Sequence, residues 1–170
     1  MEKPSADEYA IGYQKYFDLV SEGDYLSLLK QNSIETINFF EKIADEKLDF
    51  KYAAGKWTVK EVLMHIIDTE RVFSYRGLVA ARGDTNTLLY RMDEELYANN
   101  VRVSHRALAS LLSEFKAVRA ATEPLFANLT EAQSKLQCNI VTHPMTARAI
   151  GYFLIGHIQH HLNIIEERYL

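Results

Sequence analysis

Three of the chain's six histidines fall within five positions of the stretch GHIQHHLNII, residues 156–165. A helix turns by about 100° per residue, so His157 and His161 share one face, in the middle of the apolar arc, while His160 lies at its border. Two imidazoles at this four-residue spacing can bind a single divalent cation. Two core histidines that are hydrogen-bonded to carbonyl groups or water would show the same spacing. The spacing alone leaves both interpretations open.

A third metal ligand has to come from another segment, because metal sites of this kind need three or four ligands. His65, in VLMHIIDTER, lies at the edge of the apolar stripe of its predicted helix and can face a neighbouring helix. Taken alone, an interfacial histidine is more often structural. His105, near a predicted helix start, and His143, in a loop before Pro144, are poorer candidates, although either can approach the site in space.

Other reactive motifs are absent from the sequence. Neither the Glu-x-x-His of di-iron bundles nor the His-Glu-x-x-His of metalloproteases occurs. Glycine-rich phosphate loops and Cys-x-x-Cys pairs are also missing. The single cysteine, Cys138, has no evident activating partner, so we expect it to be inert.

The composition indicates one domain built mainly of helices. The 170 residues are 48% hydrophobic and include only three prolines and seven glycines, which disfavours a disordered chain and a turn-rich β fold. A net charge of -4 argues against nucleic acid or an anionic membrane as the main partner and leaves a small molecule or a protein. One cysteine, an acidic N-terminus and the lack of a long apolar run predict a cytoplasmic protein with no membrane span.

Apolar periodicity and capping residues predict four long helices and an additional one before them. The expected helices cover residues 5–22, 24–44, 58–81, 103–128 and 146–168. We therefore expect an all-α fold in a single domain, residues 1–170. Its four-helix bundle spans residues 24–170, and the extra helix in residues 1–23 packs on the bundle or on a second subunit.

Several helix ends carry recognisable signals. Asp24 and Thr146 are expected N-caps, and Thr58 forms a capping box with Glu61. Pro124 predicts a kink or an early end of its helix. The buried stripe of the helix over 24–44 is expected to comprise Leu28, Leu29, Ile34, Ile37, Phe40 and Ile43.

The predicted connections contain shorter elements. One turn is expected near residues 93–99, and the capping box in TEAQ, residues 130–133, opens a short helix. The stretch CNIVTHPMT, residues 138–146, is irregular and can pair briefly as strands.

Polar residues accompany His65 in the same predicted helix. Glu70 falls on the apolar side, so it needs a partner, and we expect a structural salt bridge with an arginine. A role of Arg76 in binding a substrate anion is the less favoured alternative. Asp68 and Thr69 lie one turn beyond His65 and can contact the site or orient a ligand, although Asp68 as an ordinary solvated acid is slightly favoured.

Two segments of the chain resemble the DinB/YfiT-like superfamily of small helical-bundle metalloproteins. They are GKWTVKEVLMHIIDTERVFSYR, from Gly55 to Arg76, and GHIQHHLNIIEERYL, from Gly156 to Leu170. Together they contain the tryptophan before the capping box, one histidine in the second bundle helix and the His-x-x-x-His of the last. The resemblance covers the chain from about Asp24 to the C-terminus. It is specific for the fold and the metal site and unspecific for the substrate.

The resemblance implies that His65, His157 and His161 are the metal ligands, and that His160 accompanies them without being one. Three imidazole ligands alone do not discriminate between zinc, nickel, copper and iron. The resemblance favours zinc or nickel. A homodimer is also expected, because relatives often pair through bundle helices.

Three functions are compatible with such a site. Three histidine ligands leave coordination positions open, which is more typical of a catalytic site than of a structural one. The resemblance favours a low-molecular-weight-thiol S-transferase that acts on a small-molecule substrate through metal-bound thiolate or water, with Asp68, Thr69 and His160 as neighbours of the ligands. A metal-dependent hydrolase of a small molecule is one alternative. A non-catalytic metal- or ligand-binding bundle is another, and a fourth ligand such as Asp68 or His160 would then close the site.

Overall fold

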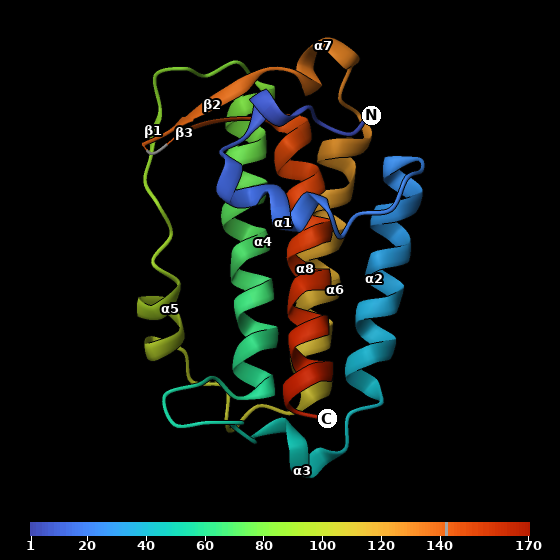
Figure 1. Ribbon diagram of the computed structural model, residues 1–170, viewed down its shortest axis with the longest axis vertical. Coiled ribbons are helices and arrows are strands. Elements are labelled where there is room, and N and C mark those ends of the chain that lie inside the picture. Colours follow the sequence, from blue (N-terminus) through green and yellow to red (C-terminus); the bar gives the residue numbers. More distant parts are fainter. Residues whose placement is uncertain (142) are drawn as a thin grey trace.

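Four long helices form the body of the computed structural model, which describes residues 1–141 and 143–170. They lie side by side along the longest axis (Figure 1): α2 (Tyr25–Glu41), α4 (Val59–Ala81), α6 (Leu108–Ala127) and α8 (Ala147–Arg168). α4 packs most extensively against α8 and then α6, and α2 packs against α6 and α8. The predicted all-α fold with a four-helix bundle is confirmed.

Side-chain caps fix the starts of three bundle helices. Asp24 and Thr146 each accept a hydrogen bond from the backbone N–H three residues later. Thr58 does the same and forms the predicted capping box with Glu61. These caps satisfy N–H groups that have no partner inside their helix, so the predicted starts of α2, α4 and α8 are confirmed.

The bounds of α6 differ from the prediction. The helix begins at Leu108 rather than near residue 103, because Val103 is buried in the preceding segment and its carbonyl accepts a hydrogen bond from the Arg106 N–H. It continues past Pro124, for which a kink or an early end is predicted, and ends at Ala127, close to the predicted residue 128. The proline removes one hydrogen bond close to the helix end, and Phe126 in the last turn is buried in the core.

Shorter helices lie in the connections: α3 (Asp45–Leu48), α5 (Glu94–Asn100) and α7 (Glu131–Ser134). α3 follows soon after α2, which ends at Glu41, somewhat before the predicted end. α5 corresponds to the turn predicted near residues 93–99, and α7 to the short helix predicted from TEAQ. Figure 1 shows α5 beside α4, outside the bundle.

A small sheet lies at the end of the bundle where α8 begins (Figure 1). Its strands, in spatial order, are β1 (Leu88–Leu89), β2 (Gln137–Ile140) and β3 (His143–Thr146). β1 pairs with β2 in parallel, and β2 pairs with β3 antiparallel, with Cys138 opposite Met145. The strand pairing predicted for residues 138–146 is confirmed, except that Thr142 lies outside the described residues.

The N-terminal segment, residues 1–23, does not form the continuous helix predicted over residues 5–22. It contains the short 3-10 turns η1 (Ala6–Glu8) and η2 (Ile11–Tyr13) and the helix α1 (Gln14–Phe17), and it crosses α8 (Figure 1). At the crossing, a Cβ on Gly156 would lie only 2.0 Å from the carbonyl oxygen of Tyr16. Such close backbone contact leaves no space for the side chains that a long helix would place between the two axes.

The apolar core consists of two clusters that follow one another along the bundle. Phe153 and Ile155 belong to the cluster near the sheet, and Phe115 and Ile158 to the other. His157 lies on α8 between the two clusters. No helix in the described parts of the chain is long and apolar enough to cross a membrane.

Candidate metal centre and its cavity

Three histidines from two adjacent helices converge at the junction of the two core clusters. His65 extends from α4, and His157 and His161 from α8. The Nε2 atom of His157 lies 3.1 Å from that of His65 and 3.1 Å from that of His161. One ring nitrogen from each residue can be chosen so that all three lie within 4.8 Å of one another. The structure therefore brings together the three residues proposed as ligands from the sequence.

The triad has the donor set and the spacing that a divalent ion requires. Two nitrogens bound at about 2.05 Å to a tetrahedral zinc ion lie about 3.3 Å apart, close to the 3.1 Å of the two Nε2 pairs. Hydrogen bonds alone account less well for this arrangement. The Nε2 atom of His157 has either one lone pair or one hydrogen, so it cannot form a full hydrogen bond with both His65 and His161. These residues could therefore hold a metal ion.

Burial keeps the triad in the protonation state that binds metals. It lowers the pKa of His65 to about 4. Burial, followed by the neighbouring histidines, lowers the pKa values of His157 and His161 well below their ordinary value. All three imidazoles are therefore neutral near pH 7, and a neutral imidazole offers a lone pair to a cation.

The triad opens into a cavity of about 590 Å³. This volume is typical of pockets that bind small molecules. Much of its wall is aromatic: Tyr13, Tyr16, Trp57, Phe73 and Phe153. The ring of Trp57, the chain's only tryptophan, lies 4.8 Å from that of His65. The triad thus borders a partly apolar chamber.

Of the three residues expected to accompany the ligands, two line the triad's cavity and one, Asp68, lines another pocket. Thr69 and His160 line the triad's cavity, and the His160 ring meets the Tyr16 ring edge-on at 5.2 Å. His143, a poorer candidate in the sequence, also lines this cavity. His105 is exposed near the start of α6.

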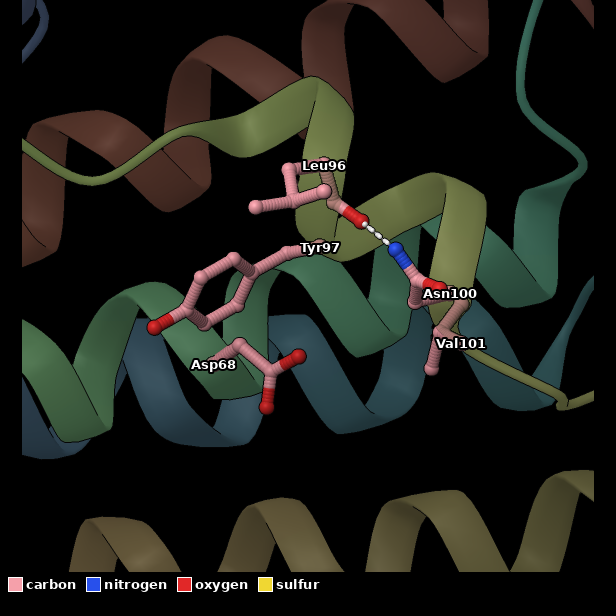
Figure 2. Close-up of a pocket in the computed structure, with 5 residues that line it drawn as sticks. All are labelled: Asp68, Leu96, Tyr97, Asn100 and Val101. Atoms are coloured by element: carbon pink, nitrogen blue, oxygen red, sulfur yellow. Dashed lines mark hydrogen bonds between the residues drawn. The ribbon is translucent and has the colours of Figure 1, made fainter.

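Asp68 belongs to a different, shallow pocket beside α5. Figure 2 shows its carboxylate beneath the ring of Tyr97, with Leu96, Asn100 and Val101 completing the pocket. It also forms an ion pair with Arg71 at 3.3 Å. The structure therefore does not place Asp68 in the lining of the triad's cavity.

Sequence reasoning missed most of the cavity's charged lining. Lys15, Arg76 and Arg91 contribute cations, whereas Glu94 contributes a carboxylate and pairs with Arg91 at 3.1 Å. Of these, only Arg76 was considered. One sequence signal could have indicated that the N-terminal segment forms part of the cavity wall. Gly156 lies on the buried face of its helix, and a glycine there indicates close approach of another backbone.

Solved structures with a similar fold support the bundle assignment. YfiT from Bacillus subtilis, described as a probable metal-dependent hydrolase with an unusual four-helix bundle topology, superposes with a TM-score of 0.73 at 20% identity, over 98% of this chain and 90% of that one. A DinB-like protein from Bacillus subtilis, YjoA, gives a TM-score of 0.59 at 19% identity, over 85% and 88% of the two chains.

A third similar structure is a mycothiol-dependent maleylpyruvate isomerase. It superposes with a TM-score of 0.60 at 10% identity, over 85% of this chain and 59% of that one. At such identities these similarities concern the fold. None of the curated proteins compared with this chain matches it.

The family model of the DinB superfamily matches residues 28–165. The match includes the four bundle helices almost completely and all three histidines of the triad, and it begins after the N-terminal segment. Because it spans most of the sequence, this chain belongs to the DinB superfamily.

Proposed function

We propose that this protein is a metal-dependent enzyme in which His65, His157 and His161 hold one zinc or nickel ion. The observation that carries the proposal is the position of the triad at the wall of a cavity large enough for a small molecule. No fourth histidine, cysteine or carboxylate completes the group among the described residues, whereas structural zinc sites have four protein ligands. Coordination positions are therefore left for a substrate.

We propose thiol transfer as the reaction. A divalent ion, when bound, acts as a Lewis acid and favours the thiolate over the thiol. The thiol sulfur forms a bond to an electrophilic carbon of the substrate, the leaving group departs with its bonding electron pair, and the thiol proton passes to solvent. The mycothiol-dependent isomerase with a similar fold motivates this choice.

The chain's own residues would bind and orient the reactants. The aromatic wall of Tyr13, Tyr16 and Phe153 excludes water from an apolar substrate part. Three cationic side chains line the same cavity, Lys15, Arg76 and Arg91, against one carboxylate, Glu94, and this excess of positive charge favours an anionic molecule.

Hydrolysis is the second candidate, because YfiT is described as a probable metal-dependent hydrolase. In that reaction water replaces the thiol as the nucleophile at the same site.

The test compares both reactions on zinc- and nickel-loaded protein. Thioether formation between glutathione or cysteine and a chromogenic aryl halide reports transfer, and release of nitrophenol from an activated ester without thiol reports hydrolysis. We expect metal-dependent thioether formation that is lost in His161→Ala and kept in His105→Ala, which changes an exposed histidine outside the cavity. Ester hydrolysis alone would favour the second candidate, and metal binding without either reaction would contradict an enzymatic function.

A further inference from the structure

Three arginines of the described chain are buried, and they differ in their partners. Arg119 forms an ion pair with Glu70 at 2.8 Å, and Arg148 forms one with Glu8. Arg76 is only 3% exposed, and no carboxylate in the described residues lies within ion-pair distance of it. Because an unpaired buried charge is costly, a guanidinium in this position calls for an anion from outside the chain.

The contacts of Arg76 leave part of its guanidinium free. Its Nη2 donates a hydrogen bond to the carbonyl of Tyr90 at 2.7 Å, and the group lies 4.4 Å from the centre of the Phe73 ring. Its other two nitrogens, Nε and Nη1, donate to no described group. Neither of them is fully buried. Arg76 lines the 590 Å³ cavity, so a ligand bound there can reach its guanidinium.

The surroundings of Arg76 favour an anion over a neutral group. Tyr13, whose hydroxyl can donate a hydrogen bond, lines the same cavity, and the one carboxylate in the lining, Glu94, is already paired with Arg91. The guanidinium is planar and presents several N–H donors side by side, so it matches the two oxygens of a carboxylate.

The position of Arg76 relative to the triad sets the size of the molecule. Its Cα lies about three helical turns beyond that of His65 on α4, about 16 Å along the axis. The side chain leans back over Phe73, one turn nearer to His65. The guanidinium and the triad are therefore on the order of 10 Å apart along the helix.

We propose that Arg76 binds a carboxylate of the substrate whose reacting group lies at the histidine triad. The substrate class is then a small elongated carboxylic acid, with its carboxylate on the order of 10 Å from the reacting atom. This assignment rests on the proposed function, because it concerns the same site.

The test observes the Nε–H signal of Arg76 by NMR on the full chain, with and without zinc, while glutarate is added at constant ionic strength. Glutaramide, which has the same carbon chain and no charge, is the matched probe. We expect the signal to shift and saturate with glutarate in both forms of the protein and to stay unchanged with glutaramide. An Arg76 signal that glutarate moves no further than chloride does would overturn the proposal.

Variants provide a second readout. Arg76→Gln is expected to weaken glutarate binding about tenfold or more, and Arg76→Lys by a smaller factor, because lysine keeps the charge without the planar fork. Arg82→Gln, which changes an exposed arginine following α4, is expected to leave binding unchanged. If Arg76→Gln fails to fold, Arg76→Lys is the test, and glutarate binding by that variant with wild-type affinity contradicts the proposal.

Zinc binding on the same samples separates the two proposals, since Trp57 beside His65 reports it through its fluorescence. Intact zinc binding without a glutarate response rejects the role of Arg76 alone. A glutarate response without zinc binding rejects the metalloenzyme alone.

Discussion

Arg119 of α6 and Glu70 of α4 form a two-point ion pair inside the bundle, with Nε–Oε1 and Nη2–Oε2 distances of 2.8 Å each. Their side chains are 2% and 1% exposed. Arg119 also donates to the backbone carbonyl of Leu29 at 3.1 Å, so one side chain joins α2, α4 and α6. The structural salt bridge predicted for Glu70 is therefore present, with its arginine on a different helix.

Breaking this pair on one side is expected to destabilise the bundle. We predict that Glu70→Gln lowers the free energy of unfolding by about 3–5 kcal/mol, because it leaves the Arg119 charge buried without its partner. Chemical denaturation measures the loss. The double variant Glu70→Gln/Arg119→Met should lose less than the sum of the two single variants, and strict additivity would show that the pair does not couple the helices.

The contact between Gly156 and the N-terminal segment gives a second prediction. Gly156→Ala is expected to lower the free energy of unfolding by about 1–3 kcal/mol and to expose residues 1–23 to proteases, because the new methyl group meets the Tyr16 backbone. Denaturation and limited proteolysis measure the two effects. Gly12→Ala is the matched control, since a Cβ there meets nothing within 4 Å. Equal protease resistance of both variants would contradict the close crossing.

Glu8 makes the attachment of the N-terminal segment dependent on pH. Burial raises its pKa, but hydrogen bonds from Arg148, Thr146 and Ser5 outweigh burial and lower the pKa to about 2 from an ordinary 4.5. A carboxyl group with a lowered pKa stabilises the folded state above its unfolded pKa. This contribution is therefore complete above about pH 4.5 and is lost as the pH falls toward 2.

We predict that Glu8→Gln lowers the free energy of unfolding at pH 7 by on the order of 1–3 kcal/mol. The difference from the wild type should shrink as the pH falls from 4.5 toward 2, as measured by denaturant titrations at several pH values. A difference that stays constant over this range would show that the Glu8 carboxylate is not the source of the stability.

Zinc should stabilise the folded protein, because the unfolded chain does not hold the three histidines together. At a free zinc concentration of 100 times Kd, the free energy of unfolding is expected to rise by about 2.7 kcal/mol. Thermal unfolding with and without zinc measures this effect. His161→Ala should abolish the rise and the neighbouring His160→Ala should keep it, whereas equal responses of the two variants would place the ion elsewhere.

Local patterns were sufficient to predict the four bundle helices and part of the triad. His157 and His161 share a face because α8 is a regular helix, so their four-residue spacing determines their relative direction. His65 followed from the stripe of α4 together with the family resemblance. The ligand roles, the homodimer and the cytoplasmic location stay predictions.

Features that depend on contacts between distant segments could not be predicted. Ile34 is predicted to belong to the buried stripe of α2 but is 53% exposed, because that helix packs mainly on α6 and α8, with a face that includes the polar Thr36. Tyr13 and Tyr16 recur at helical spacing, yet they line a cavity wall. Periodicity shows which apolar residues share a face of a helix, but it does not show which other segment packs on that face.

The most direct test of the metal centre is the metal content of protein purified without chelator or affinity-tag histidines. We expect about one equivalent of zinc or nickel per chain in the wild type, lost in His161→Ala and retained in His160→Ala. A wild-type protein that contains no metal and takes up neither added zinc nor added nickel would contradict this expectation, and so would a His161→Ala variant with undiminished metal.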